Sequence, residues 1–198
     1  MPSPKRTSPL PLPLPLPSPP MYVYDDTRHT SIAGNAPVSA KQQMVSALSV
    51  FMHGGTGFAD AIGGRLVITE AEITRKREEP ARMEARVVCE IDVEQDMVNG
   101  GGNMHGGCSA YLIDVCSTLP IVGLMDAMER GGTGGVSQVL DVVYHSPARV
   151  GDRLRIVSTT ISLGARAMTA RSEIWNDVQH RLVATGVHIK MDPSPSKL

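Results

Sequence analysis

The sequence has few aromatic residues, few cysteines and no excess of either charge. Only 4% of its 198 residues are aromatic and Trp175 is the sole tryptophan, which predicts a core of aliphatic side chains and methionine. The three cysteines lack CxxC spacing, which argues against a disulfide framework or a zinc site and favours a reducing compartment. The formal net charge is -1 and no long stretch is dominated by one sign, so we expect no nucleic-acid-binding module.

Long hydrophobic runs are also missing from the sequence. We find no run of about 18 apolar residues and therefore expect no membrane-spanning helix. Hydrophobic residues still make up 41% of the chain, which is enough for a core. At a soft prior of roughly 150 residues per domain, the length suits one domain over residues 38–191, flanked by an arm over residues 1–30 and a tail over residues 192–198.

Proline is concentrated at the start of the chain. Nine of the 15 prolines lie in the first 20 residues, mostly in a Pro-Leu alternation from Pro9 to Pro17. Proline fixes φ and removes an amide donor, so we expect a disordered, polyproline-like arm. Lys5 and Arg6 hint at a transit peptide, but the prolines forbid the amphipathic helix that such a signal needs. A PxxP ligand for an aromatic-lined groove is another role open to the arm.

Between the ends, hydrophobic spacing predicts two helices and six strands. The helices are expected over residues 38–52 and 108–129, the second being apolar on nearly every face and therefore buried. The strands are expected over residues 66–74, 82–92, 136–145, 152–163, 166–177 and 180–191. Short links favour antiparallel pairing, with the last four strands in a meander, so we expect an α+β domain whose five- or six-stranded sheet curls round the long helix. A free edge strand favours dimerisation.

The residues best suited to chemistry surround the start of the long helix. Asn99, the triple glycine 100–102, His105 and Gly106 precede it, and Asp114 lies inside it. Glycines there let a ligand approach the backbone, and the free amides favour partial negative charge such as an oxyanion. A carboxylate among apolar neighbours is expensive to bury without a purpose or a partner. We expect no metal ion, because His105 and Asp114 lack a third ligand at useful spacing.

The spacing of His105 and Asp114 restricts how they can cooperate. Nine residues at about 100° each give roughly 900°, so the two side chains project from opposite sides of the helix. They cannot easily serve one site within one subunit. We therefore expect the site to lie at a dimer interface, with the loop from one subunit and the carboxylate from the other.

The pattern Asn99-x5-His105-Gly106-Gly107-x6-Asp114 resembles the signature of the hotdog-fold acyl-CoA thioesterases, in the phenylacetate-type and thioesterase-superfamily-member branch. Further matching stretches are Gly135–Ser137, Tyr144–Ala148 with Gly151-Asp152, and Gly186–His188. The resemblance covers about residues 58–190. It implies the hotdog fold, hydrolysis of acyl-CoA to a free acid and CoA without a cofactor, and a homodimer or a tetramer formed as a dimer of dimers.

The resemblance also implies a role for each matching residue. Asp114 would be the general base that activates water, or the nucleophile that attacks the thioester. Ser137 would hold the water, and the Gly106 amide would polarise the carbonyl. Asn99 and His105 would bind near the thioester. Residues expected to bind the substrate are Gly107, Tyr144, Ser146, Arg149, Ser162, Gly164, Arg166 and His188, with the two guanidinium groups suited to the CoA phosphates.

Two other functions are compatible with the same pattern. A hydratase or dehydratase can be built on the same fold, although such enzymes more often use an Asp-His pair in a different motif. A non-catalytic acyl-CoA-binding protein could use the proline-rich arm to recruit partners. Pro120 within the long helix is a departure, because proline removes a helical hydrogen bond and kinks the helix.

The last three residues, Ser196-Lys197-Leu198, spell the tripeptide that the peroxisomal import receptor reads at a free C-terminus. We therefore predict a peroxisomal location, with the cytoplasm and the mitochondrion as alternatives. A fluorescent fusion at the N-terminus should enter peroxisomes, and a fusion that masks Leu198 should not. Peroxisomal import of the masked fusion would contradict the prediction.

Overall fold

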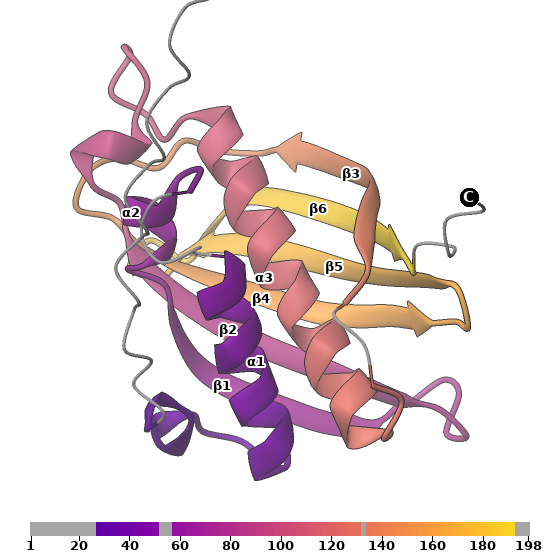
Figure 1. Cartoon of the computed structure of the whole chain (residues 1–198). Helices are drawn as coiled ribbons and strands as arrows, with labels where there is room; N and C mark the ends of the chain where they lie inside the picture. Colours follow the sequence, from indigo (N-terminus) through magenta and orange to yellow (C-terminus); the bar gives the residue numbers. More distant parts are fainter. Residues whose placement is uncertain (1–26, 52–56, 132–133, 193–198) are drawn as a thin grey trace, which may run out of the picture.

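The computed structural model describes residues 27–51, 57–131 and 134–192 (Figure 1). Most of the expected arm, residue 52 of the first expected helix and the expected targeting tripeptide lie outside these ranges. Residues Arg28–Ser31, placed near the end of the arm by the sequence, form a 3-10 helix.

The domain is one six-stranded antiparallel sheet crossed by a long helix, as the sequence predicts (Figure 1). The strands are β1 Val67–Arg75, β2 Met83–Asp92, β3 Val136–Tyr144, β4 Arg153–Leu163, β5 Ala167–Asn176 and β6 Arg181–Met191. The central helix α3 spans Gly106–Ala127, and α1, Val38–Phe51, packs beside it. Two short helices, α2 over Asp60–Gly63 and a 3-10 turn over Gln95–Met97, were not expected.

The order of the strands corrects the expected four-stranded meander. The sheet runs β1-β2-β4-β5-β6-β3, so β3 pairs with β6 at one edge and not with β4. The link between β3 and β4 looks like a hairpin turn in the sequence, but its hydrogen bonds go elsewhere. Ala148 O accepts from Met104 N at 2.7 Å, and Gly151 N donates to Val93 O at 2.9 Å. The link is therefore a crossing connection held against the glycine-rich loop.

The long helix is the centre of the core. Fifteen of the 22 residues of α3 are buried, which confirms that its apolar character reflects burial on most faces. Two glycines allow this close packing. A Cβ on Gly123 would overlap the side chain of Met44 on α1, and a Cβ on Gly186 of β6 would lie 2.8 Å from Ile113 Cγ2.

The central helix combines length with a strongly apolar composition. By length and composition alone, α3 is long and apolar enough to cross a bilayer. Small polar residues such as Ser109, Ser117 and Thr118 interrupt its apolar run, but the mean hydropathy of the helix remains high. In the fold, 83% of the most apolar part of α3 is buried against the sheet and α1, so the protein core accounts for its apolar side chains.

Candidate active site

The glycine-rich loop before α3 is organised by Asn99. Its side-chain oxygen accepts hydrogen bonds from Gly101 N at 2.9 Å and Asn103 N at 3.4 Å, and its backbone N donates to Asn103 O at 2.8 Å. An asparagine that closes a turn in this way is common, because its side chain mimics the backbone. The amide hydrogens on Nδ2 are the part of Asn99 left to donate to a substrate.

His105 forms the N-cap of α3. Its Nδ1 accepts from Gly107 N at 2.9 Å, and its carbonyl oxygen accepts from Cys108 N at 2.8 Å. Within the part of the chain that the structure describes, the Gly106 amide has no acceptor, although it is the first amide of the helix. An open amide at a helix N-terminus is suited to bind a developing negative charge.

Tyr144, the last residue of β3, closes one side of this helix start. Its hydroxyl donates to Gly106 O at 3.0 Å, and a Cβ on Gly106 would lie 3.3 Å from the tyrosine ring. Ser146 follows and donates to Leu182 O. A surface depression of about 360 Å³ opens here, lined by Met104, Gly106, Ser109, Tyr144, His145, Ser146, Pro147, Ala148 and Val183.

Asp114 lies two turns further along α3, against the start of β3 and the end of β6. Ser137 Oγ donates to Asp114 Oδ1 at 3.3 Å. His188 Nε2 is 2.9 Å from Ser137 Oγ and 3.4 Å from Asp114 Oδ1. The His188 side chain is fully buried, whereas 46% of the Asp114 side chain is exposed. The carboxylate is therefore backed by two polar groups on one side and open to solvent on the other.

Two further residues complete this group, and the sequence analysis did not select them. Ser117 Oγ lies 2.7 Å from His188 Nδ1. Lys190 is only 4% exposed and follows His188 by two residues on β6, so both point to the same face of the sheet. Two features of the sequence could have identified them. Ser117 places a hydroxyl one turn after Asp114 on an apolar helix, and Lys190 follows Gly186 and His188 at every second position of one strand.

Burial controls the charge of His188. Desolvation is the main cause that lowers the pKa of His188 to about 4; the nearby Lys190 charge acts in the same direction, and the Asp114 carboxylate opposes both effects. Desolvation also lowers the pKa of Lys190, against the opposing attraction of Asp114. His188 is therefore neutral near pH 7, and it acts on Asp114 through hydrogen bonds and not as a cation.

The expected site residues form two separate groups within one chain. The loop group contains Asn99, His105, Gly106 and Gly107, and Tyr144, Ser146 and Arg149 lie beside it. The carboxylate group contains Asp114, Ser137 and His188. Among the described residues no hydrogen bond joins the two groups, and Gly106 and Asp114 are about 12 Å apart along the axis of α3.

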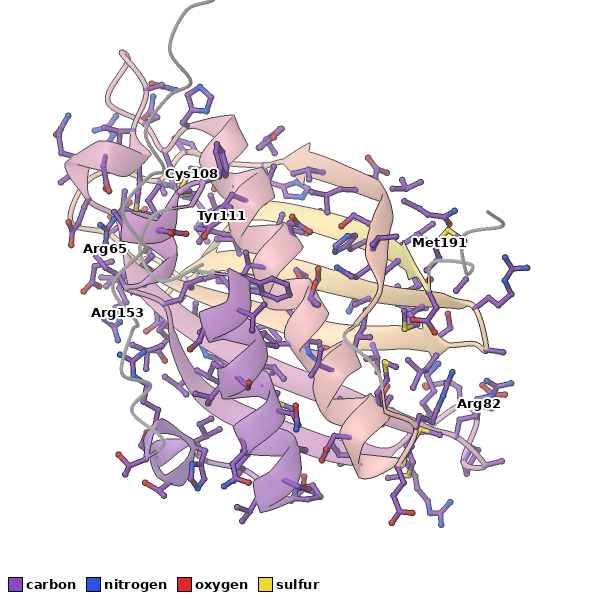
Figure 2. The ribbon with its side chains drawn as sticks, in the orientation of Figure 1. Arg65, Arg82, Cys108, Tyr111, Arg153 and Met191 are labelled. Carbon is purple, nitrogen blue, oxygen red and sulfur yellow. The ribbon has the colours of Figure 1, made fainter. Side chains whose placement is uncertain are left out.

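The substrate-binding residues expected from the sequence are divided in the same way. Arg149 N donates to Asp152 Oδ2 at 2.8 Å just before β4 begins, whereas Ser162, Gly164 and Arg166 lie at the other end of β4. Eleven residues of strand separate these ends by about 35 Å. Figure 2 shows the same separation, with Cys108 at the start of α3 far from Met191 at the end of β6. His188, expected on the CoA-binding surface, is instead buried beside Asp114.

Comparisons with known proteins decide the family. A model of the thioesterase superfamily matches residues 101–183. Acyl-coenzyme A thioesterase 13 from Mus musculus and from Homo sapiens are each 32% identical over 105 residues, which is 53% of this chain and 71% of each relative. The chain belongs to the thioesterase superfamily. This membership confirms the family expected from the sequence and places the protein among thioester hydrolases.

Solved structures of this superfamily confirm the hotdog fold. The crystal structure of zebra fish thioesterase superfamily member 2 superposes with a TM-score of 0.60 at 26% identity, covering 75% of this chain and 94% of the other. The E. coli PaaI protein has a TM-score of 0.54 at 17% identity and shares the fold, over 82% of this chain and 99% of the other. The range matched by the superfamily model includes Gly106, Asp114 and Ser137, and it excludes Asn99 and His188.

The lowered pKa of His188 predicts a pH-dependent stability. The ordinary histidine pKa is 6.5 and the folded value is about 4, so between these values the unfolded chain binds a proton that the folded chain does not. The free energy of unfolding should therefore fall as the pH falls from 6.5 to 4, by at most roughly 3 kcal/mol from this group. Urea denaturation across this range should show a shallower decline for His188→Gln than for the wild type.

A matched control is His145→Gln, because the His145 side chain is exposed at the end of β3. This variant should keep the wild-type dependence on pH. Parallel curves for the wild type and His188→Gln would show that His188 contributes nothing to the decline.

Proposed function

We propose that this member of the thioesterase superfamily hydrolyses acyl-CoA to a free carboxylic acid and CoA, with Asp114 as the essential carboxylate. The observation that carries the proposal is the environment of Asp114. Its carboxylate is half-exposed, it is oriented by Ser137 and His188, and it lies on the helix whose first amide is open. The acyl-CoA substrate is supported by the two acyl-coenzyme A thioesterase relatives.

The hydrogen bonds of the carboxylate group and of the loop group suggest a role for each in hydrolysis. Ser137 occupies Asp114 Oδ1, which leaves Oδ2 to accept a proton from water. The water oxygen then attacks the thioester carbon, and the carbonyl electrons move to an oxyanion that the Gly106 amide stabilises. When the oxyanion collapses, the C–S bond breaks and the CoA thiolate takes the proton from Asp114. Direct attack by Asp114, with water hydrolysing the resulting anhydride, is the alternative route.

We infer that the two groups of residues meet between two copies of the chain. The strand β3 is an edge strand, and Val136, Val139, Val143 and Tyr144 are each about half exposed. An exposed edge offers unpaired backbone groups to a second strand. The strand begins beside Asp114, at Ser137, and ends on Gly106, at Tyr144.

This position of β3 explains how one site could use both groups. If β3 of two copies pairs in antiparallel register about its middle, Ser137 of one copy lies opposite Val143 of the other and therefore next to its Tyr144. The carboxylate group of each copy then faces the loop group of the other on the same side of the extended sheet. A two-fold symmetric dimer would contain two such sites.

Replacing Asp114 with asparagine should remove the proton acceptor while preserving the shape of the side chain. We expect kcat for acyl-CoA hydrolysis to fall by at least about 10²-fold, measured as release of free CoA thiol. Asp126→Asn, the same substitution near the other end of α3, should keep its activity. Unchanged turnover in Asp114→Asn would remove this carboxylate from the mechanism. If the wild-type protein itself binds acyl-CoA but does not hydrolyse it, the protein is a binding protein and not an enzyme.

Mixing two inactive variants tests the shared site. Asn99→Ala damages the loop group and Asp114→Asn damages the carboxylate group, so a hybrid dimer keeps one intact site. After subunit exchange in an equimolar mixture, about a quarter of the wild-type activity should return. No recovery, with hybrid dimers demonstrated by mass spectrometry, would place both groups of each site in a single copy.

A further inference from the structure

We propose that Ser117 is a positioning residue that holds His188 in the tautomer with its proton on Nε2, so that Ser117, His188 and Ser137 form a directed hydrogen-bond chain ending on Asp114. The tautomer follows from the contacts inside one chain. Its catalytic consequence rests on the proposed thioesterase function.

The direction of the chain is set at its Asp114 end. An ionised carboxylate can only accept hydrogen bonds, so the Ser137 hydroxyl, 3.3 Å away, donates to Asp114 Oδ1. A hydroxyl has one hydrogen, so Ser137 must accept from the ring nitrogen that lies 2.9 Å from it. That nitrogen is His188 Nε2, which therefore carries the proton.

The other end of the imidazole requires a donor. A neutral imidazole with a proton on Nε2 has a lone pair on Nδ1, and this atom lies 2.7 Å from Ser117 Oγ. Ser117 has a competing acceptor in Asp114 O at 3.1 Å, but Thr118 Oγ1 already donates to that carbonyl at 2.9 Å. The Ser117 hydrogen is therefore available for the shorter contact.

The opposite tautomer would be unfavourable. A proton on Nδ1 would leave the Nε2 lone pair 3.4 Å from the Asp114 carboxylate oxygen and would turn the Ser137 hydrogen away from it. Lone pairs of Nε2 and of Ser137 Oγ would then both face Asp114 Oδ1, and both contacts would be repulsive, the first of them at the fully buried imidazole. Asp114 from α3 and Lys190 from β6 are the charged groups that influence His188, while β3 contributes Ser137, and burial keeps the imidazole neutral.

The chain has a consequence for Asp114. Because Oδ1 receives a hydrogen bond from a fixed serine, the carboxylate cannot rotate freely, and Oδ2 keeps one direction towards the exposed side. Ser117 contacts the Asp114 backbone carbonyl but neither of the carboxylate oxygens, so its path to the carboxylate runs through His188.

The tautomer can be read from the ¹⁵N chemical shifts of selectively labelled histidine at pH 7, without substrate. In the wild type, the Nε2 of His188 should have the shift of a protonated nitrogen and Nδ1 that of an unprotonated, hydrogen-bonded nitrogen. Ser117→Ala should move the Nδ1 resonance and lower kcat about tenfold with little change in KM. Ser117→Thr, which restores a hydroxyl, should recover both.

Thr118→Val is the matched control, because Thr118 donates to the same Asp114 carbonyl but, among the described residues, forms no hydrogen bond with His188. It should leave the ¹⁵N shifts unchanged. A wild-type spectrum with the proton on Nδ1, or a Ser117→Ala spectrum identical to that of the wild type, would overturn the proposal. Because these spectra need no turnover, they remain decisive even if acyl-CoA hydrolysis is not found.

Discussion

The structure depends on the placement of one half-exposed carboxylate on a helix that is mostly buried. Asp114 remains half-exposed at the margin of the sheet, and Ser137 and His188 contact its inner oxygen. The helix must lie close to β6 for these contacts to form, and Gly186 permits this because a larger residue would collide with Ile113. The close packing of α3 against β6 therefore also fixes the position of the Asp114 carboxylate.

The second organising feature is β3, which connects the two groups of polar residues. Its first residues hold Asp114, and its last residue closes on Gly106 at the start of α3. In the expected meander β3 would pair with β4, whereas in the structure it pairs with β6 and forms one edge of the sheet. At the edge of the sheet it is open to a second copy, and this placement supports a site built by two chains.

The sequence predicts the elements well because their signals are local. The period-two alternation of β2 and the glycines that bound α3 place these elements within a few residues of their observed ends. The edge position of β3 was missed because pairing depends on distant contacts, such as those of Ala148 with Met104. Ser117 and Lys190 were missed for the same reason, since only the folded helix and sheet bring them to His188.

The central claim is that Asp114 of one copy faces the Gly106 amide of another. A crystal structure of the oligomer with a non-hydrolysable acyl-CoA analogue tests it most directly. The account predicts an Asp114 carboxylate about 6 to 7 Å from the Gly106 nitrogen of the neighbouring copy, enough for one water and the carbonyl group between them. An oligomer in which β3 is not at the interface, with these atoms far apart, would contradict it.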